Sequence, residues 1–393
     1  MSARAAHAPQ ARNCWCMIMP MDPMVCTTHS ATAASRAGDS DADGAALRAA
    51  LHAAGLSAFA VAELQPLPHS GLAHDHWRLC GTGWLLRVPK QSQMRLSALE
   101  NLRYQAACFD RAAASARVPR LLALLTPSTA LPHGALVVEE ISGRAARLPQ
   151  DLPALIEALA ALHVLPWPEA GPAPLQCDAD PFYCLMLEIE AQAMYLQAAG
   201  VSSCVTQVVR EGLASLARLC AETARPPRAL ISFDGHPGNF VVRADGTAVL
   251  VDLEKCRYAY AGLDLAHATL YTSTTWDRQS CAVLDVHEVA QAYRHWARCM
   301  KPSVAVAARP WHLPLRRAMW LWSLSWCAKW RVLSQGPARA DADGEDWSVE
   351  RSDMALIGHV RERVDHYLGD PAVQHVLAEF EALARLGDTF GVP

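Results

Sequence analysis

The stretch LISFDGHPGNFVVRADGTAVLVDLEKC, residues 230–256, places polar side chains at close spacing within two apolar, strand-like segments. Acidic and amide side chains are costly to bury unless another group pairs with them. The polar residues concerned are Asp234, His236, Asn239, Asp252 and Glu254. Their spacing predicts a site that handles a metal ion, a phosphate group or a proton.

The same stretch predicts a β-hairpin that brings these residues together. The segment 244–246 contains the Asp-Gly pair that is typical of a tight turn. Asn239 then begins the first strand and Asp252 ends the second, so both lie at the same end of the hairpin. An amide oxygen and a carboxylate suit Mg²⁺, and Asp234, in the preceding loop, is placed to accept a proton from a hydroxyl group. Phosphoryl transfer needs this division of roles.

Length and composition limit the class of protein. With 393 residues, the chain can form two or three domains or one large two-lobed enzyme, and 52% hydrophobic residues exclude a disordered protein. A net charge of -4 gives no reason to expect nucleic acid or an anionic membrane as partner. The 13 cysteines are an odd number without a C-x-x-C pair, so we expect buried thiols in the reducing cytoplasm.

The chain is expected to divide into three parts. Residues 1–45 lack apolar periodicity and predict a disordered or non-native leader. Residues 46–140 predict a small lobe, and 141–393 predict a large, mainly helical lobe that contains the hairpin, with a hinge at 141–144. The small-lobe strands are expected at 60–67, 74–81, 83–89, 120–125 and 135–141, with a helix at 95–114. The principal large-lobe helices are expected at 151–165, 180–200, 203–223, 312–333 and 373–386.

The segments SFDGHPGN (232–239) and VDLE (251–254) resemble the catalytic segment of the aminoglycoside phosphotransferase and choline kinase family. That family commonly shows His-Gly-Asp-x-His-x-x-Asn followed by Ile-Asp-x-Asp/Glu. Further segments that resemble the family, in the right order within residues 46–335, are ALVVEEISG (135–143), LAALHVL (159–165) and GLDLAHA (262–268). The resemblance implies an α+β, bilobal, protein-kinase-like fold with a five-stranded antiparallel sheet in the small lobe.

The resemblance also implies roles for the polar residues of the hairpin. Asp234 would be the catalytic base toward the acceptor hydroxyl. Asn239 and Asp252 would hold Mg²⁺ on the phosphates of ATP, with Glu254 as a nearby helper. Asp264 would brace the large lobe rather than take part in the chemistry.

In the small lobe, the resemblance implies a set of nucleotide contacts. Arg87, on the third strand, would contact the phosphates, and Glu100, on the following helix, would be its partner carboxylate. Lys90 is a second candidate for phosphate contact, and Ser70 and Gly71 would donate backbone hydrogen bonds to phosphate oxygens. The plainer alternatives are an exposed strand arginine for Arg87 and a local surface ion pair for Glu100.

The expected function is transfer of the γ-phosphate of ATP, with Mg²⁺, to a hydroxyl of a small molecule: an amino sugar, an amino alcohol or a related metabolite. The alternative is a catalytically silent nucleotide-binding or scaffold protein. It is favoured by Ser232-Phe233 in place of His-Gly and by a nucleotide loop that is poor in glycine. A third possibility is a hydrolase, but the sequence contains no nucleophile motif such as G-x-S-x-G to support it.

Two further groups of side chains bear on acceptor binding and on metal binding. Trp322, Trp326 and Trp330 share one face of the helix expected at 312–333. Such a stripe is usually core, although aromatic faces also bind amines, and the basic residues of this helix argue against a cation pocket. The histidines of PHSGLAHDHW (68–77) lack a fixed fourth ligand, so they predict no metal site.

Overall fold

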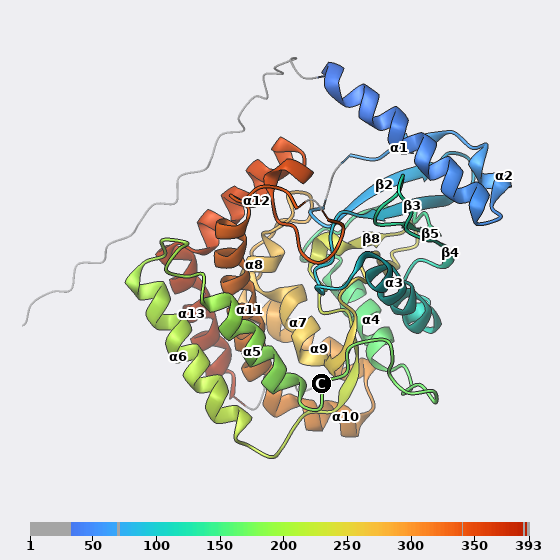
Figure 1. Ribbon diagram of the computed structural model, residues 1–393. Helices are drawn as coiled ribbons and strands as arrows, with labels where there is room; N and C mark the ends of the chain where they lie inside the picture. Colours follow the sequence, from blue (N-terminus) through green and yellow to red (C-terminus); the bar gives the residue numbers. More distant parts are fainter. Residues whose placement is uncertain (1–32, 69–70, 340, 388–389, 391–393) are drawn as a thin grey trace, which may run out of the picture. The chain divides into compact units, whose positions relative to one another are not determined.

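The computed structural model describes residues 33–68, 71–339, 341–387 and 390 (Figure 1). The chain divides into two compact units, Met1–Asp41 and Ala42–Pro393. The described part of the first unit is helical, because helix α1 (Ala33–Ala53) begins there. Residues 33–45 of the predicted leader are therefore helical, and residues 1–32 lie outside the described residues. Everything below concerns the second unit.

A five-stranded antiparallel sheet forms the first part of this unit, as predicted. Its strands, in the spatial order β1-β2-β3-β5-β4, are β1 (Leu64–Pro66), β2 (His74–Leu79), β3 (Trp84–Pro89), β5 (Ala135–Glu139) and β4 (Leu121–Leu125). Leu47 and Leu51 of α1 pack with Leu86 against one face, while α3 (Ala98–Ala112) contributes Phe109 to the core that includes Val138.

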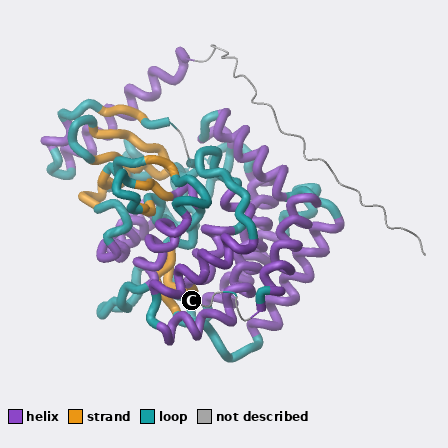
Figure 2. Tube along the Cα trace, turned by 180° about the vertical axis from the view of Figure 1, so that it is seen from behind, coloured by secondary structure: helices purple, strands orange, loops and turns teal. Residues whose placement is uncertain are grey.

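The rest of the unit is mainly helical, which Figure 2 shows as purple segments beside the orange strands. After the short α2 (Ser57–Ala60), which precedes the sheet, the helices beyond it are α4 (Leu152–His163), α5 (Pro181–Ala193), α6 (Ser203–Cys220), α7 (Ala261–Thr269), α8 (Tyr271–Thr274), α9 (Val286–Cys299), α10 (Pro302–Ala308), α11 (His312–Leu333), α12 (Met354–Tyr367) and α13 (Asp370–Arg385). Each predicted long helix is present. In the part of the chain that the structure describes, no helix is long and apolar enough to cross a bilayer.

The predicted hairpin is confirmed. Strand β8 (Phe240–Val242) pairs with β9 (Ala248–Leu250), and Gly246 takes the left-handed φ of +84° in the turn between them. A left-handed φ costs glycine little because it has no Cβ atom. The chain leaves β5 at Glu139 and joins the hairpin sheet at β6 (Arg144–Ala145), so it changes sheet within residues 140–143.

A second strand pair brackets the hairpin. Strand β7 (Arg228–Ile231) runs antiparallel to β10 (Arg257–Tyr260), with Ile231 opposite Arg257. The loop that follows β7 and the segment that precedes β10 therefore lie side by side. The first of these segments carries Asp234, and the second carries Asp252 and Glu254.

Helix α11 lies at the centre of the helical region and contacts α5, α6, α7, α12 and α13. Its Arg316 is fully buried and binds Glu379 of α13 through Nε and Nη2, at 2.9 and 2.6 Å from Oε1. The same guanidinium donates to the side chain and carbonyl oxygens of Thr269. One buried charge thus joins three helices.

We predict that Glu379→Ala lowers the free energy of unfolding by about 3–5 kcal/mol, because it leaves the Arg316 charge buried without its partner. The control is Arg385→Ala on the same helix, which removes an exposed pair with Glu381 and is expected to cost about 1 kcal/mol or less. Urea denaturation followed by circular dichroism measures both. Equal losses in the two variants would contradict the prediction.

Candidate active site

A cavity of about 470 Å³ is lined by residues of the sheet, the hairpin and the helical region. Of the predicted site residues, the cavity lining includes Gly71, Arg87, Asp234, Asn239, Asp252 and Glu254. Residues that lie more than 150 positions apart in the sequence therefore meet in one space. Ser70 lies outside the described residues.

The loop that carries Asp234 is held by a buried carboxylate. Asp264 of α7 is fully buried and accepts hydrogen bonds from the backbone N–H groups of Ser232 and Phe233, both at 2.8 Å, and from the Ser232 hydroxyl at 3.0 Å. His163 Nδ1 accepts a hydrogen bond from Trp296 Nε1, so its Nε2 carries the proton and donates to Asp264 at 3.1 Å. These bonds confirm the bracing role of Asp264.

Phe233 shows why this bracing is needed. Its φ is +57°, a left-handed conformation that a bulky residue adopts only when its surroundings enforce it. Its ring packs edge-to-face on Trp322, with centroids 5.2 Å apart, and lies under the guanidinium of Arg257 at 3.7 Å. The loop therefore turns sharply at Phe233, immediately before Asp234.

Asp234 is paired with a cation that sequence reasoning did not identify. Lys255 Nζ donates to Asp234 Oδ2 at 2.7 Å. Burial acts to raise the pKa of Asp234, but Lys255, followed by His236 and His267, outweighs it and leaves the pKa below its usual value. Asp234 is thus ionised at neutral pH, as a base must be. The sequence did offer one signal, because Lys255 directly follows Glu254 in the segment that was expected to hold Mg²⁺.

Arg87 of β3 reaches across the cavity to the hairpin. Its Nη2 donates to Asp252 Oδ1 at 2.5 Å and lies 3.1 Å from His74 Nδ1, and its Nη1 is 3.4 Å from the carbonyl oxygen of Val251. Only 4% of Arg87 is exposed, so the alternative of a solvent-facing strand arginine is wrong. Burial acts to raise the pKa of Asp252, but the charge of Arg87 leaves it well below its usual value.

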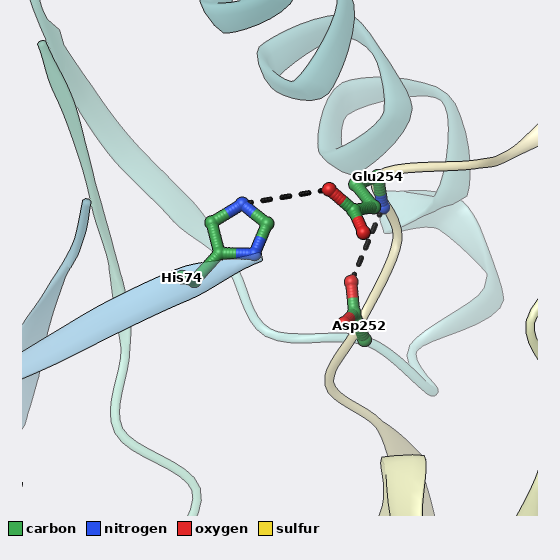
Figure 3. Close-up of side chains that lie close together, drawn as sticks. All are labelled: His74, Asp252 and Glu254. Carbon is green, nitrogen blue, oxygen red and sulfur yellow. Dashed lines mark hydrogen bonds and ion pairs between the residues drawn. The ribbon is translucent and has the colours of Figure 1, made fainter. Parts of the chain in front are cut away.

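Figure 3 shows the group formed by His74, Asp252 and Glu254, in which one possible ligand atom from each residue lies within 4.8 Å of the others. His74 Nε2 lies 3.7 Å from Glu254 Oε2. Both histidine nitrogens are engaged, Nδ1 with Arg87 and Nε2 with Gln105 Oε1 at 3.0 Å. Burial, followed by Arg87, holds the pKa of His74 well below its usual value, so the imidazole is neutral.

The oxygen atoms nearby fit a hard cation. Asn239 Nδ2 donates to the carbonyl oxygen of Asp234 at 2.9 Å, so the amide oxygen is the atom that can act as a ligand. Asp252 and Glu254 add carboxylates, and Mg²⁺ prefers such oxygen ligands over imidazole. The donor set at the end of the hairpin therefore suits Mg²⁺ without His74.

Glu254 is a buried carboxyl group with an unusual pKa. Burial, followed by the charge of Asp252, raises its pKa to about 8. Its Oε1 accepts a hydrogen bond from Gln93 Nε2 at 2.6 Å. Glu254 is therefore mostly protonated at neutral pH while no cation is bound beside it.

The structure does not bring two of the predicted nucleotide residues to the cavity lining. Glu100 is the third residue of α3, where its Oε2 accepts hydrogen bonds from the backbone N–H and hydroxyl of Ser97 in a capping box. The expectation that Glu100 pairs with Arg87 is therefore corrected, because the carboxylate caps its own helix. Lys90 Nζ donates to the carbonyl oxygen of Gly71 at 3.0 Å and so holds that loop.

One end of the cavity is aromatic. We call it the aromatic end, and its residues are Trp276, Trp322, Trp326, Trp347 and Tyr367. Trp326 packs edge-to-face on Trp276 and on Trp347, with centroids 5.8 and 5.5 Å apart. The tryptophan stripe of α11 is thus divided: Trp322 and Trp326 line the cavity, whereas Trp330 is core.

The basic residues of α11 have partners of their own. Arg316 is paired with Glu379, Lys329 with Glu345 and Arg331 with Asp365. The guanidinium of Arg317 lies over the ring of Phe380, at 5.7 Å from its centroid. The pairing of these charges weakens the argument from sequence against an amine site, and Lys329 Nζ is the one of them that lies near an aromatic residue of this end, at 5.9 Å from the ring centroid of Trp347.

Comparisons with known proteins agree with this geometry. The model of the phosphotransferase enzyme family (APH) matches residues 63–301, so the chain belongs to that family. No curated protein sequence matches the chain. The family and the fold implied by the resemblance are confirmed.

Solved structures share the fold at low sequence identity. An ethanolamine kinase from Plasmodium vivax has 12% identity and a TM-score of 0.54, over 82% of this chain and 86% of that one. A choline/ethanolamine kinase family protein from Mesorhizobium loti has 16% identity and a TM-score of 0.51, over 86% and 99%. A thermostable mutant of aminoglycoside phosphotransferase APH(4)-Ia, in a ternary complex with AMP-PNP and hygromycin B, has 16% identity and a TM-score of 0.50, over 83% and 94%.

We predict a pH-dependent effect of Glu254→Gln on stability in the presence of EDTA. Because the pKa of Glu254 is raised from 4.5 to about 8 on folding, its protonation stabilises the wild type fully below about pH 4.5, and this stabilisation is lost as the pH rises through about 8. The free energy of unfolding of the variant minus that of the wild type should therefore increase from pH 5 to pH 8 and then level off.

Urea denaturation at each pH provides this difference. Glu100→Gln is the control, because hydrogen bonds from Ser97 lower the pKa of Glu100 rather than raise it, so no such increase is expected. A difference between Glu254→Gln and wild type that does not change with pH would show that Glu254 titrates normally.

Proposed function

We propose that this protein transfers the γ-phosphate of ATP, with Mg²⁺, to a hydroxyl group of a small molecule. One observation carries the proposal: the ionised Asp234, the oxygen ligands of Asn239 and Asp252, and the buried guanidinium of Arg87 line a single cavity. A base, a cation site and a phosphate-binding cation are the parts that phosphoryl transfer requires. The phosphotransferase family match supports the same reaction type.

The nucleotide is proposed to lie between the sheet and the hairpin. Apolar residues of the cavity lining there, such as Leu85, Val138 and Ile141, would contact the base. Arg87 and the backbone N–H groups of Ser70 and Gly71 would contact phosphate oxygens, with Lys90 holding the loop at Gly71. This arrangement divides the chain into a small lobe at 46–140 and a large lobe at 141–393.

The proposed mechanism assigns one task to each side chain. Asp234 accepts the proton of the acceptor hydroxyl, and its bond to Lys255 fixes the orientation of the carboxylate. Arg87 donates hydrogen bonds toward the phosphates. Asn239, Asp252 and Glu254 would hold Mg²⁺, which neutralises phosphate charge when bound.

The aromatic end supports an amino alcohol rather than an amino sugar as the acceptor. Asp277, which follows Trp276 in the sequence, also lines the cavity, and its carboxylate already accepts hydrogen bonds from the backbone N–H groups of Gln279 and Ser280. A sugar that carries several ammonium groups would need several carboxylates there. A single amine attached to a small apolar body suits tryptophan faces.

A catalytically silent nucleotide-binding protein is the second candidate. It is favoured by the contact of 2.5 Å between Arg87 and Asp252, since this contact occupies an oxygen that a cation needs. The decisive experiment is turnover of Mg-ATP by the full chain with a panel of amino alcohols, amino sugars and metabolites. Nucleotide binding without turnover on any acceptor would favour the silent protein.

We predict that Asp234→Asn lowers kcat by about 100-fold to 10,000-fold, the range expected for loss of a general base, while nucleotide affinity changes little. Asp245→Asn, in the exposed turn of the same hairpin, is the matched control and should leave kcat unchanged. Phosphate transfer is measured with radiolabelled ATP. Full activity of Asp234→Asn would exclude it as the base.

We predict that Trp326→Leu raises the KM for the acceptor about tenfold, because a desolvated cation–aromatic contact contributes about 1–2 kcal/mol. The KM for ATP should stay within twofold of the wild-type value, because Trp326 belongs to the aromatic end. Trp167→Leu, at a half-exposed tryptophan elsewhere, serves as the control. An unchanged acceptor KM would place the acceptor away from the aromatic end.

A further inference from the structure

Arg87 is a buried cation whose hydrogen-bond acceptors lie on the hairpin and on β2. Its Nη2 meets both Asp252 Oδ1 and His74 Nδ1. Its Nε is buried without a hydrogen-bond partner among the described residues. Glu100 of α3, which was expected to pair with it, caps its own helix instead. The guanidinium therefore depends on His74 for the one side-chain acceptor that comes from the sheet.

The tautomer of His74 follows from its neighbours. A guanidinium can only donate, so His74 Nδ1 accepts from Arg87 and the ring proton is on Nε2. That N–H donates to Gln105 Oε1 at 3.0 Å. Gln105 belongs to α3 and is fully buried. A continuous line of hydrogen bonds thus runs from β3 through β2 to α3.

This line matters because Asp252 has two tasks in the proposed function. As a cation ligand, Asp252 must share or release its contact with Arg87. The His74 contact involves none of the oxygen ligands and can persist when the cation is bound. Both His74 nitrogens are used in the line, so His74 is not itself a metal ligand.

We propose that His74, oriented by Gln105, is the positioning residue that holds Arg87 toward the nucleotide phosphates, and that this neutral link joins α3 to the phosphate-binding arginine in place of Glu100. The inference rests on the proposed function, since it needs a nucleotide in the cavity. It assigns roles to two residues, His74 and Gln105, that the sequence motifs do not mark.

The test compares binding of Mg-AMP-PNP to full-length variants by calorimetry. His74→Phe keeps a planar ring but has no acceptor, so nucleotide affinity should fall about tenfold or more, as expected for loss of a hydrogen bond to a charged group. His74→Asn places an amide oxygen near the position of Nδ1 and should restore affinity to within about threefold. Glu100→Gln retains the capping box and should bind within twofold of wild type.

A kinetic measurement separates positioning from general damage to the fold. In His74→Phe the KM for ATP should rise while the KM for the acceptor stays the same, and His74→Asn should reverse the rise. Thermal unfolding checks that each variant is folded. Should His74→Phe not fold, Gln105→Met removes the acceptor for Nε2–H without changing the strand, and it should weaken nucleotide binding about threefold to tenfold.

Each outcome bears on a different statement. Wild type that fails to bind Mg-AMP-PNP overturns the proposed function and this inference together. Wild type that binds and turns over, with folded His74→Phe or Gln105→Met binding equally well, overturns the inference alone. A loss in Glu100→Gln as large as that in His74→Phe would overturn it too, because the arginine would then depend on the acidic residue of α3.

Discussion

The ion pair between Arg87 and Asp252 joins the sheet to the hairpin across the cavity. Each member is expensive to bury alone, and a buried pair offsets its desolvation only when further hydrogen bonds satisfy the remaining atoms. Val251 and His74 supply such bonds to Arg87. The low pKa of Asp252 and the high pKa of Glu254 follow from this arrangement. Asp252 is paired with the Arg87 guanidinium and stays ionised, whereas the buried Glu254 beside it keeps its proton.

The Asp234 side of the cavity follows the same rule with different partners. Lys255 compensates Asp234, and Asp264 is compensated by hydrogen-bond donors from Ser232, Phe233 and His163. The backbone at Phe233 is held in its left-handed conformation by those bonds, so the direction of Asp234 is set before any ligand arrives. Preorganised polar groups of this kind need little rearrangement when charge develops.

Elements whose formation depends on neighbouring residues could be predicted from the sequence. The Asp-Gly turn at 245–246 and the apolar strands beside it predict the hairpin, and helical periodicity predicts α11 at its observed bounds. The partners of the site residues were not predictable in this way. Lys255 faces Asp234 only because β7 pairs with β10, and His74 meets Arg87 only through the register of β2 and β3.

Glu100 and the tryptophan stripe of α11 are two features whose roles could not be predicted from the sequence. Position three of a helix that follows Ser97 favours a capping box, and this local bond prevents the expected pairing with Arg87. Periodicity marks one face of α11 as apolar, but it cannot separate Trp330, which is covered by other helices, from Trp326, which lines a cavity. Tertiary contacts alone make that distinction.

The loop that follows α11 contacts α3 and the aromatic end. Its Gly344 exchanges backbone hydrogen bonds with Ser92 and Leu96, and Asp343 Oδ1 accepts from the first N–H of α3, at Ala98, at 2.8 Å. Trp347, three residues after Gly344, belongs to the aromatic end. Because α3 also carries Gln105, which binds His74, any displacement of α3 must strain both this loop and the line of hydrogen bonds that ends at Arg87. The position of one helix therefore constrains the phosphate-binding arginine and the aromatic end together.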